Sequence, residues 1–296
     1  MPEVPNERVT YFQGKVEDVE DLLPAFKNCD TVIHCAAALS PLGVTHRELY
    51  RANVDGTKNV ILACISRGVR RLVYTSSTAA VLSRSEALNR VQTGSEDQNP
   101  YPEDATDFFE KYGYTKFLSE MFVLKVNHPG VLTTCVLRPS LIFGRGDGKL
   151  GDRLMNGLET HFLGDGNNVL DFVHVSDVAQ AHLLCEQALR LPKSDDIAGR
   201  AFFVGSGRPT TVKEFFDWGH GAPKPIRIER ALFFASVNLW MWNIFKYAPF
   251  GRWLTEDRIT TYSSSWWFPV FSARQAFGYQ PKNPLDAKRM MIEGEL

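Results

Sequence analysis

The chain of 296 residues is long enough for one large domain or two modest ones with a sizeable buried core. Its hydrophobic share of 44 %, with 12 % aromatic and 23 % charged residues, is ordinary for a globular protein and excludes general disorder. The 33 Lys and Arg nearly balance the 34 Asp and Glu, so no nucleic-acid partner is expected. The five cysteines are scattered without a C-x-x-C pair, which favours reduced thiols over a disulfide framework or a metal site.

Short apolar runs alternate with amphipathic segments through the first half of the chain. The runs rich in β-branched residues are typical of buried parallel strands, and Gly68 stands where the longest predicted helix would stop. The predicted elements in chain order are a strand at 9–12, a helix at about 17–27, a strand at 31–37, a helix at about 46–66, a strand at 71–77, a surface loop at about 83–104, a helix at about 105–126 and a strand at 131–137.

This alternation predicts an α/β fold with a doubly wound, Rossmann-like parallel sheet. The pattern loosens after about residue 145, although a helix at about 175–190 and a strand at 201–204 still resemble core elements. We therefore expect a first domain over 1–147, with elements returning to it near 169–205, and an aromatic-rich region over 148–296.

A tyrosine and a lysine lie four residues apart on the helix predicted at 105–126. Tyr112 and Lys116 share one helical face, and a neighbouring ammonium would lower the pKa of a phenol, ordinarily ~10, toward neutrality. The Y-x-x-x-K spacing alone is weak, because it also fits an amphipathic Tyr beside a solvated Lys. However, Ser76 and Ser77 end a predicted strand at the sheet edge where ligands bind, although either could simply cap a helix. Together these groups predict a proton relay for an alcohol or carbonyl oxygen.

Six motifs follow one another along the chain: VIHCAA, NVDGTKNV, LVYTSS, YGYTK, LRPSLIFGRGD and DFVHVSDVAQAHLL. The later part adds LGDGNNV, AFFVGSGRPTTVKEFF and TYSSSWWFPVFSARQAFGYQPK. In this number and order the motifs resemble the extended short-chain dehydrogenase/reductase superfamily, and within it the 3β-hydroxysteroid dehydrogenase family. The later segments are most similar to its sterol-4α-carboxylate 3-dehydrogenase group. The resemblance covers nearly the whole chain from Val9 onward.

The resemblance implies a role for each matching position. It makes Tyr112 the acid/base, Lys116 its partner and a contact of the nicotinamide ribose, and Ser77 or Ser76 the group that holds the substrate oxygen. The implied cofactor is NAD or NADP, and no metal is implied. Asn53 would pack near the active site. The residues expected along the cofactor are Cys35, Ala36, Ala37, Pro139 and Ile142, each of which core or turn packing would explain equally well.

The implied reaction is oxidation of a 3β-hydroxyl on a sterol or triterpenoid, with hydride passing to the nicotinamide. With a carboxylate at C4 the product is a β-keto acid, which loses carbon dioxide without a further catalytic residue. The resemblance also implies a cytosol-facing protein at the endoplasmic reticulum or lipid-droplet surface, and it leaves a homodimer open.

The family opens with a strand, a glycine-rich turn and a helix that binds the pyrophosphate, and this sequence does not open with such a unit. Val9 to Phe12 corresponds to the family's third strand. The glycine-rich run Gly144 to Lys149 follows a late strand and is not the missing turn. Two explanations are open. The chain is either a truncated form of a normal enzyme, which the intact relay residues favour, or a degenerate relative that binds the cofactor poorly.

The stretch 231–254 is the most apolar of the chain, but interruptions such as Asn238 and Lys246 keep it short of a membrane span. Trp240, Trp242 and Trp253 with nearby basic residues predict peripheral membrane contact, or else a pair of helices over the substrate pocket. The alternatives to a sterol dehydrogenase are a nucleotide-sugar epimerase or dehydratase, which the aromatic stretch disfavours, and a non-catalytic relative that binds lipid.

Overall fold

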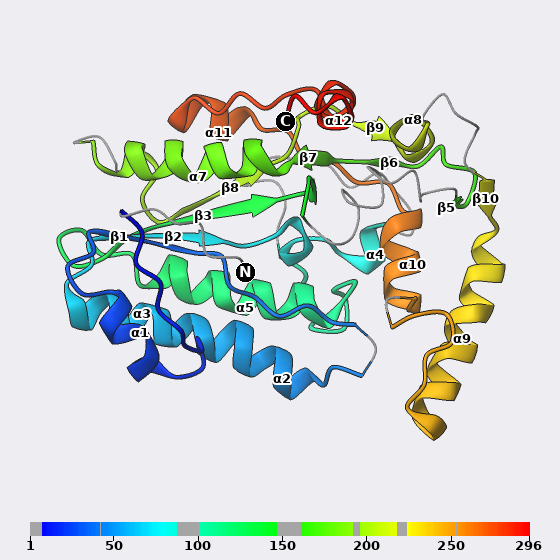
Figure 1. Ribbon diagram of the computed structural model, residues 1–296, viewed down its shortest axis with the longest axis horizontal. Coiled ribbons are helices and arrows are strands. Elements are labelled where there is room, and N and C mark those ends of the chain that lie inside the picture. The colour runs from blue at the N-terminus through cyan, green and yellow to red at the C-terminus, as the bar shows by residue number, and fades with distance from the viewer. Residues whose placement is uncertain are drawn as a thin grey trace.

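The computed structural model describes residues 8–41, 43–87, 101–146, 161–191, 196–217, 224–252 and 254–296. A parallel sheet of four strands lies at its centre, in the order β1-β2-β3-β8 (Figure 1). In register, His34 lies opposite Tyr74, and Thr75 lies opposite Leu137, so the carboxyl ends of the strands meet at one edge. The predicted Rossmann-like fold is confirmed. The strand bounds are β1 Thr31–His34, β2 Arg71–Thr75, β3 Thr133–Pro139 and β8 Arg200–Val204.

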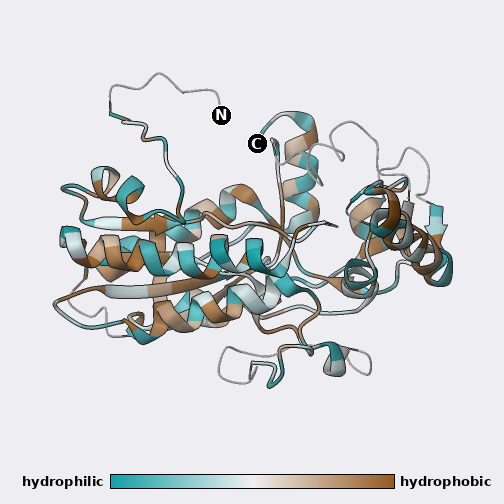
Figure 2. Ribbon diagram, turned by 90° about the horizontal axis from the view of Figure 1, so that it is seen from below, coloured by the Kyte–Doolittle hydropathy of each residue, from teal (hydrophilic) through white to brown (hydrophobic). Residues whose placement is uncertain are grey.

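Three helices cover one face of this sheet: α1 (Val19–Ala25), α3 (Gly56–Arg67) and α5 (Lys111–Lys125) (Figure 1). Hydrophobic and hydrophilic residues alternate along them, as amphipathic helices on a sheet require (Figure 2). Their inner side chains form one buried cluster with the sheet, which buries enough apolar surface to hold the layer in place. Its main members are Val60, Ile61, Cys64, Val69, Leu72, Tyr74, Val123, Leu132 and Val136.

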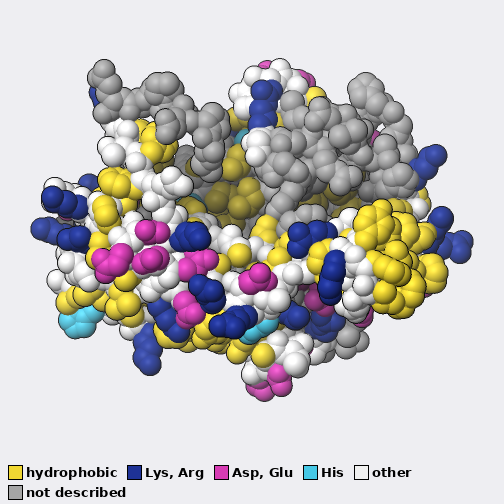
Figure 3. All heavy atoms as spheres, turned by 60° about the horizontal axis from the view of Figure 1, so that its bottom comes forward, with side chains coloured by type: hydrophobic (Ala, Val, Ile, Leu, Met, Phe, Trp, Pro, Cys, Tyr) yellow, Lys and Arg dark blue, Asp and Glu magenta, His cyan; other side chains and the backbone are white. Residues whose placement is uncertain are grey.

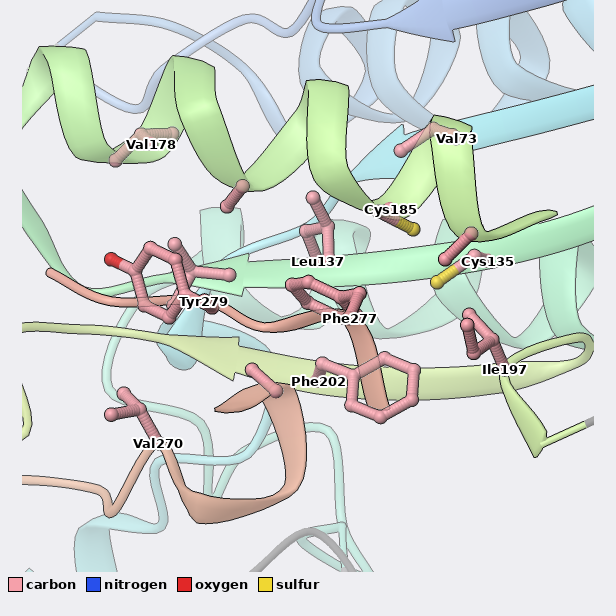
Figure 4. Close-up of a cluster of buried hydrophobic side chains, with 14 of the residues drawn as sticks. Val73, Cys135, Leu137, Val178, Cys185, Ile197, Phe202, Val270, Phe277 and Tyr279 are labelled. Carbon is pink, nitrogen blue, oxygen red and sulfur yellow. The ribbon is translucent and has the colours of Figure 1, made fainter. Parts of the chain in front are cut away.

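The other face is covered by α7 (Val175–Leu189) and α11 (Phe271–Phe277). Figure 4 shows the cluster between them, with Val178 and Cys185 on α7, Leu137 on β3 and Phe277 on α11. Helix α7 and strand β8 therefore pack with the first sheet. The boundary between domains at 147/148 remains a prediction, because residues 147–160 lie outside the described residues.

The remaining short strands form three pairs around an aromatic core. Phe172 stacks on Phe215 with ring centroids 3.7 Å apart, and Phe203 stacks on Phe268 at 4.2 Å. Trp266 is buried in the same cluster. The paired strands are β4 (Leu141–Phe143) with β7 (Phe172–His174), β5 (His161–Leu163) with β10 (Lys224–Ile226), and β6 (Val169–Leu170) with β9 (Thr210–Thr211), and the helices beside them are α8 (Val212–Phe216) and α12 (Pro284–Glu293).

Helix α9 (Ile228–Phe245) forms one end of the molecule and packs against α10 (Glu256–Ser263) through Ala231, Ala235 and Ile259. Asn238, also buried, binds the carbonyls of Gly251 and Leu254 and fixes the turn that follows the helix. Figure 3 shows hydrophobic side chains gathered at this end, with basic residues beside them. None of the described helices is long and apolar enough to cross a bilayer.

The strand predicted at 9–12 is wrong. Val9, Tyr11 and Phe12 are exposed and carry no strand, because no described strand lies beside them to complete a hydrogen-bonded ladder. A short helix, α4 (Arg84–Ala87), begins inside the predicted loop at 83–104, most of which (88–100) lies outside the described residues. The helix predicted to start near 105 begins at Lys111 instead.

Candidate functional site

The end of β2 and the first turns of α5 build the centre of the site. Thr75 ends the strand, and Ser77 caps the short helix η2 (Thr78–Ala80) by accepting a hydrogen bond from the Ala79 amide at 3.2 Å. The capping role predicted as the alternative for these serines is therefore real for Ser77. Ser76 is buried, and its hydroxyl has no hydrogen-bond partner among the described residues. A free donor and acceptor is thus held at the sheet edge.

Tyr112 lies half-buried on the second residue of α5, within hydrogen-bonding reach of Ser77. The structure thus brings together the phenol and one of the two predicted serines. Burial raises the pKa of Tyr112 to about 12; the Glu110 carboxylate adds to this, and the Ser77 hydroxyl and Arg258 oppose it. The predicted lowering of this pKa by Lys116 is wrong, because removal of the phenolate from water outweighs the favourable charges.

Lys116 turns toward the strand end rather than toward the phenol. Its ammonium donates to the Thr75 carbonyl at 2.6 Å and lies 4.3 Å from the centre of the Tyr74 ring. Burial lowers the pKa of Lys116 to about 7, although the Glu120 carboxylate one turn further along α5 acts in the opposite direction. The lysine is therefore poised between its two charge states near neutral pH.

Asn53 fastens the loop after β1 to the active-site helix. Its amide exchanges two hydrogen bonds with the backbone of Ala38, at 2.7 and 3.0 Å, and donates to the Thr115 hydroxyl at 2.9 Å. It lies in a π-helical turn, η1 (Arg51–Asp55), between α2 (His46–Tyr50) and α3. Such turns are frequent at functional sites. The sequence places Asn53 near the site but gives no signal for the turn or for these partners.

The residues expected along a cofactor lie at the same sheet edge. Cys35, Ala36 and Ala37 follow β1 and are exposed. Pro139 is buried at the end of β3, where it pairs with Val204, and Ile142 on β4 is exposed. The structure thus leaves the β1 end and Ile142 open to a ligand, whereas Pro139 contributes to core packing.

Two ion pairs join α10 to Glu110, the residue before α5, and to Arg84, the first residue of α4. Arg258 lies 3.7 Å from Glu110, which also accepts a hydrogen bond from Ser40 at 2.9 Å. Arg84 bridges to Asp257 at 2.7 Å. The sequence did not identify this connection, because its members are far apart in the chain. It places α10 close enough to the start of α5 for the Arg258 charge to act on Tyr112.

Comparison with known proteins agrees with the motifs. Residues 3–220 match the model of the 3-beta hydroxysteroid dehydrogenase/isomerase family. The chain belongs to this family. The recognition made from the sequence is thereby confirmed at family level.

Three curated relatives illustrate the range of the family. A 3beta-hydroxysteroid-dehydrogenase/decarboxylase of Arabidopsis thaliana is 34 % identical over 94 % of this chain and 50 % of that protein. A decarboxylating sterol-4-alpha-carboxylate 3-dehydrogenase of Candida albicans is 37 % identical over 69 % and 57 %. A 2-alkyl-3-oxoalkanoate reductase of Stenotrophomonas maltophilia is 33 % identical over 95 % and 84 %. The chain thus spans about half the length of the first two.

The fold is shared with solved structures of other proteins. The UDP-glucose 4-epimerase of Thermotoga maritima superposes with a TM-score of 0.68, covering 98 % of this chain and 85 % of that one, at 22 % identity. At that identity the likeness concerns the fold alone.

Proposed function

We propose that the chain oxidises a secondary alcohol with NAD or NADP, and that its substrate is a sterol or triterpenoid carrying a 3β-hydroxyl beside a 4α-carboxylate. The observation that carries this proposal is the half-buried Tyr112 phenol within reach of Ser77, on the same helix as Lys116 and at the ligand-binding edge of the sheet. In this proposal residues 1–147 hold the cofactor and 148–296 hold the substrate.

The described residues fit the nicotinamide-ribose part of such a cofactor. The Ser76 hydroxyl is buried without a partner in the described chain, and the backbone of Cys35 to Ala37 is open to contact. Lys116 would hold the ribose, with Ile142 at the nicotinamide. When bound, the nicotinamide supplies the hydride acceptor.

The chain's own residues would transfer the proton of the substrate hydroxyl. Ser77 orients the substrate oxygen, and Tyr112 takes the hydroxyl proton during oxidation or returns it during reduction. Because the pKa of Tyr112 is raised to about 12, the phenol is protonated at neutral pH and is ready to act as an acid. Oxidation requires its phenolate, so the forward rate rises with pH.

The names of two relatives support a substrate that carries a carboxylate. A sterol 4-carboxylate that has been oxidised at C3, and a 2-alkyl-3-oxoalkanoate, both carry a ketone next to the carbon that bears the carboxylate. A β-keto acid of this kind loses carbon dioxide without an added catalytic group, so the oxidising step alone would lead to decarboxylation. The shared element is therefore a β-hydroxy or β-keto acid.

The test is to incubate the chain with NAD⁺ or NADP⁺ and two matched sterols, with and without the 4α-carboxylate. Equimolar reduced cofactor, 3-ketone and carbon dioxide are expected from the acid, with a much slower oxidation of the sterol that lacks the carboxylate. Turnover of a nucleotide sugar would favour the epimerase alternative. Failure to bind either cofactor would favour the non-catalytic, lipid-binding alternative.

We further propose that α9 lies on the surface of a membrane, at the endoplasmic reticulum or a lipid droplet. Phe233, Trp240 and Phe245 are 64 %, 58 % and 62 % exposed. Lys246 caps the end of α9, and the Arg252 guanidinium lies 5.2 Å from the centre of the Trp242 ring. Basic side chains lie beside the hydrophobic ones at this end of the molecule (Figure 3). Exposed aromatics with basic neighbours are typical of helices that lie in the headgroup layer. Trp253, named in the sequence with the other tryptophans, lies outside the described residues. The homodimer remains a prediction.

A further inference from the structure

Cys35, Thr75 and His182 form a chain of contacts next to the proposed active site. The Thr75 hydroxyl lies 3.1 Å from the Cys35 sulfur and 2.7 Å from Nε2 of His182. The three residues come from the end of β1, the end of β2 and the middle of α7. Among the five cysteines, Cys35 is the exposed one; Cys29 is partly buried and the other three are buried.

The hydrogen bonds around His182 determine which of its ring nitrogens carries a hydrogen. Its Nδ1 lies 2.7 Å from the Val178 carbonyl, which can only accept, so Nδ1 carries a hydrogen. Nε2 is then free to accept from Thr75 in the neutral ring. His182 is the base, the Val178 carbonyl orients it, and Thr75 links it to the Cys35 sulfur. This is a relayed form of the arrangement that activates nucleophiles in enzymes, in which a third group orients the base.

Two proton arrangements fit these positions. In one, the Thr75 hydroxyl donates to Nε2 of His182 and the Cys35 sulfur keeps its hydrogen. In the other, Nε2 donates to Thr75 and the Thr75 hydroxyl donates to a Cys35 thiolate, which is the direction of the Thr75–Cys35 hydrogen bond in the structure. They differ by the shift of two hydrogens along Thr75, which moves one proton from Cys35 to His182 without displacing a heavy atom.

From this geometry we propose that Cys35 is a modification site, an activated thiol that reacts with hydroperoxides and other small electrophiles while His182 stores its proton through Thr75. The proposal does not depend on the dehydrogenase activity. Exposure of the Cys35 sulfur is all that a small reagent needs.

The hydrogen bonds and charges around the Cys35 sulfur also favour an activated thiol. Burial alone would raise the pKa of Cys35, but hydrogen bonding to His182 and Thr75 and the charge of Lys116 leave it below the usual thiol value. Burial alone would lower the pKa of His182, but hydrogen bonding to Cys35 and the Val178 carbonyl leaves it raised. A lowered thiol pKa increases the thiolate fraction, which is the reactive species.

A hydroperoxide oxidises the Cys35 thiolate by two electrons. The thiolate sulfur attacks the terminal peroxide oxygen, an S–O bond forms and the O–O bond breaks. The sulfur loses two electrons and becomes a sulfenic acid, and the peroxide is reduced to an alkoxide or hydroxide, which takes the proton stored on His182. The added oxygen lies next to Thr75, whose carbonyl binds Lys116 at 2.6 Å.

The test measures alkylation of the whole folded chain by iodoacetamide from pH 5.5 to 9, with each cysteine followed by peptide mass spectrometry. Cys29, whose thiol donates to the Ala25 carbonyl, is the internal control. Cys35 is expected to react at least about tenfold faster than Cys29 at pH 7, with a midpoint below ~8.5. Thr75→Val and His182→Gln should each move that midpoint up, whereas Thr75→Ser should keep it.

Thr75→Val keeps the side-chain shape and the backbone carbonyl that holds Lys116, so it separates loss of the relay from loss of folding. An unchanged midpoint in folded Thr75→Val would overturn the proposal. Hydrogen peroxide with dimedone as the trap gives a second measurement. Adduct on Cys35 in the parent and its loss in Thr75→Val support the proposal, and equal labelling of Cys35 and Cys29 contradicts it.

Discussion

The sheet edge and the α9 end differ in which side chains they bury and which they expose. At the edge, polar groups are buried and almost all are paired inside the chain: Lys116 with the Thr75 carbonyl, Asn53 with Ala38 and Thr115. At the other end, large apolar side chains such as Phe233 and Phe245 face outward.

The contrast indicates where each region finds its partners. Buried polar groups without partners cost about 1–3 kcal/mol each, so the edge must satisfy them internally, and the few that remain open, such as the Ser76 hydroxyl, mark places for a ligand. Exposed aromatic side chains indicate a partner outside the chain, because only such a partner can remove them from water. Removing one partner at a time tests this difference between the two regions.

The largest effect is expected at the phenol. Tyr112→Phe should lower the rate of alcohol oxidation by about 10²–10⁴-fold, because positioned acid/base groups contribute that much. Tyr114→Phe is the matched control on the same helix; the Tyr114 ring packs against Phe108 and Phe117, and its loss of a hydroxyl should leave the rate within about twofold. Steady-state kinetics at fixed pH measure both. Equal rates for Tyr112→Phe and the parent would remove Tyr112 from the mechanism.

The next effect concerns stability at the buried ion pair below the site. Arg138 and Glu120 are almost fully buried; the arginine Nε donates to the carboxylate at 3.0 Å, and Nη2 donates to the Tyr101 hydroxyl at 2.8 Å. Arg138→Met leaves the carboxylate uncompensated and should lower the free energy of unfolding by about 3–5 kcal/mol.

Urea denaturation measures this loss, and Arg190→Met is the control. Arg190 pairs with Glu186 at 2.6 Å but is largely exposed, so its removal should cost under about 1 kcal/mol. The double variant Arg138→Met with Glu120→Met should recover much of the loss, since neither member of the pair is then left buried without its partner. A loss at Arg138 as small as that at Arg190 would show that the pair is not isolated from water.

The pH dependence should follow the phenol. Because the pKa of Tyr112 is raised to about 12, its phenolate fraction increases about tenfold for each pH unit between 6 and 9, and oxidation should rise with it. Reduction, which uses the protonated phenol, should not rise. Ser77→Ala removes a hydrogen bond that favours the phenolate, so oxidation should be slower at each pH. A flat oxidation profile from pH 6 to 9 would contradict the assignment.

Local patterns in the sequence predicted the features that depend on neighbouring residues in the chain. Strands β1, β2, β3 and β8 follow from runs of β-branched and apolar residues, and the Tyr112/Lys116 face follows from helical periodicity alone. The positions of the serines at the end of β2 also follow from the strand. These features need no knowledge of distant contacts.

Features that depend on distant contacts were missed or mispredicted. The strand at 9–12 was expected from its apolar residues, but a strand also needs a neighbour, which no described residue supplies. The pKa of Tyr112 was predicted from one adjacent charge, whereas burial decides it. His182 is 107 residues from Thr75, so no local pattern reveals their contact.

The smallest effect is expected at the outward-facing end. Trp240→Ser should weaken binding to vesicles containing anionic lipid by roughly fivefold to thirtyfold, because burying one large apolar side chain contributes about 1–2 kcal/mol when the burial is partial. The side chain is 58 % exposed, so the free energy of unfolding should change by less than about 0.5 kcal/mol. Flotation with vesicles measures the first quantity and urea denaturation the second.

Trp266→Ser is the contrasting variant, because Trp266 is buried in the aromatic core and its loss should destabilise the chain by several kcal/mol. If Trp240→Ser binds vesicles as well as the parent, the exposed aromatics of α9 serve a partner other than lipid, and the difference between the two ends of the molecule would need another cause.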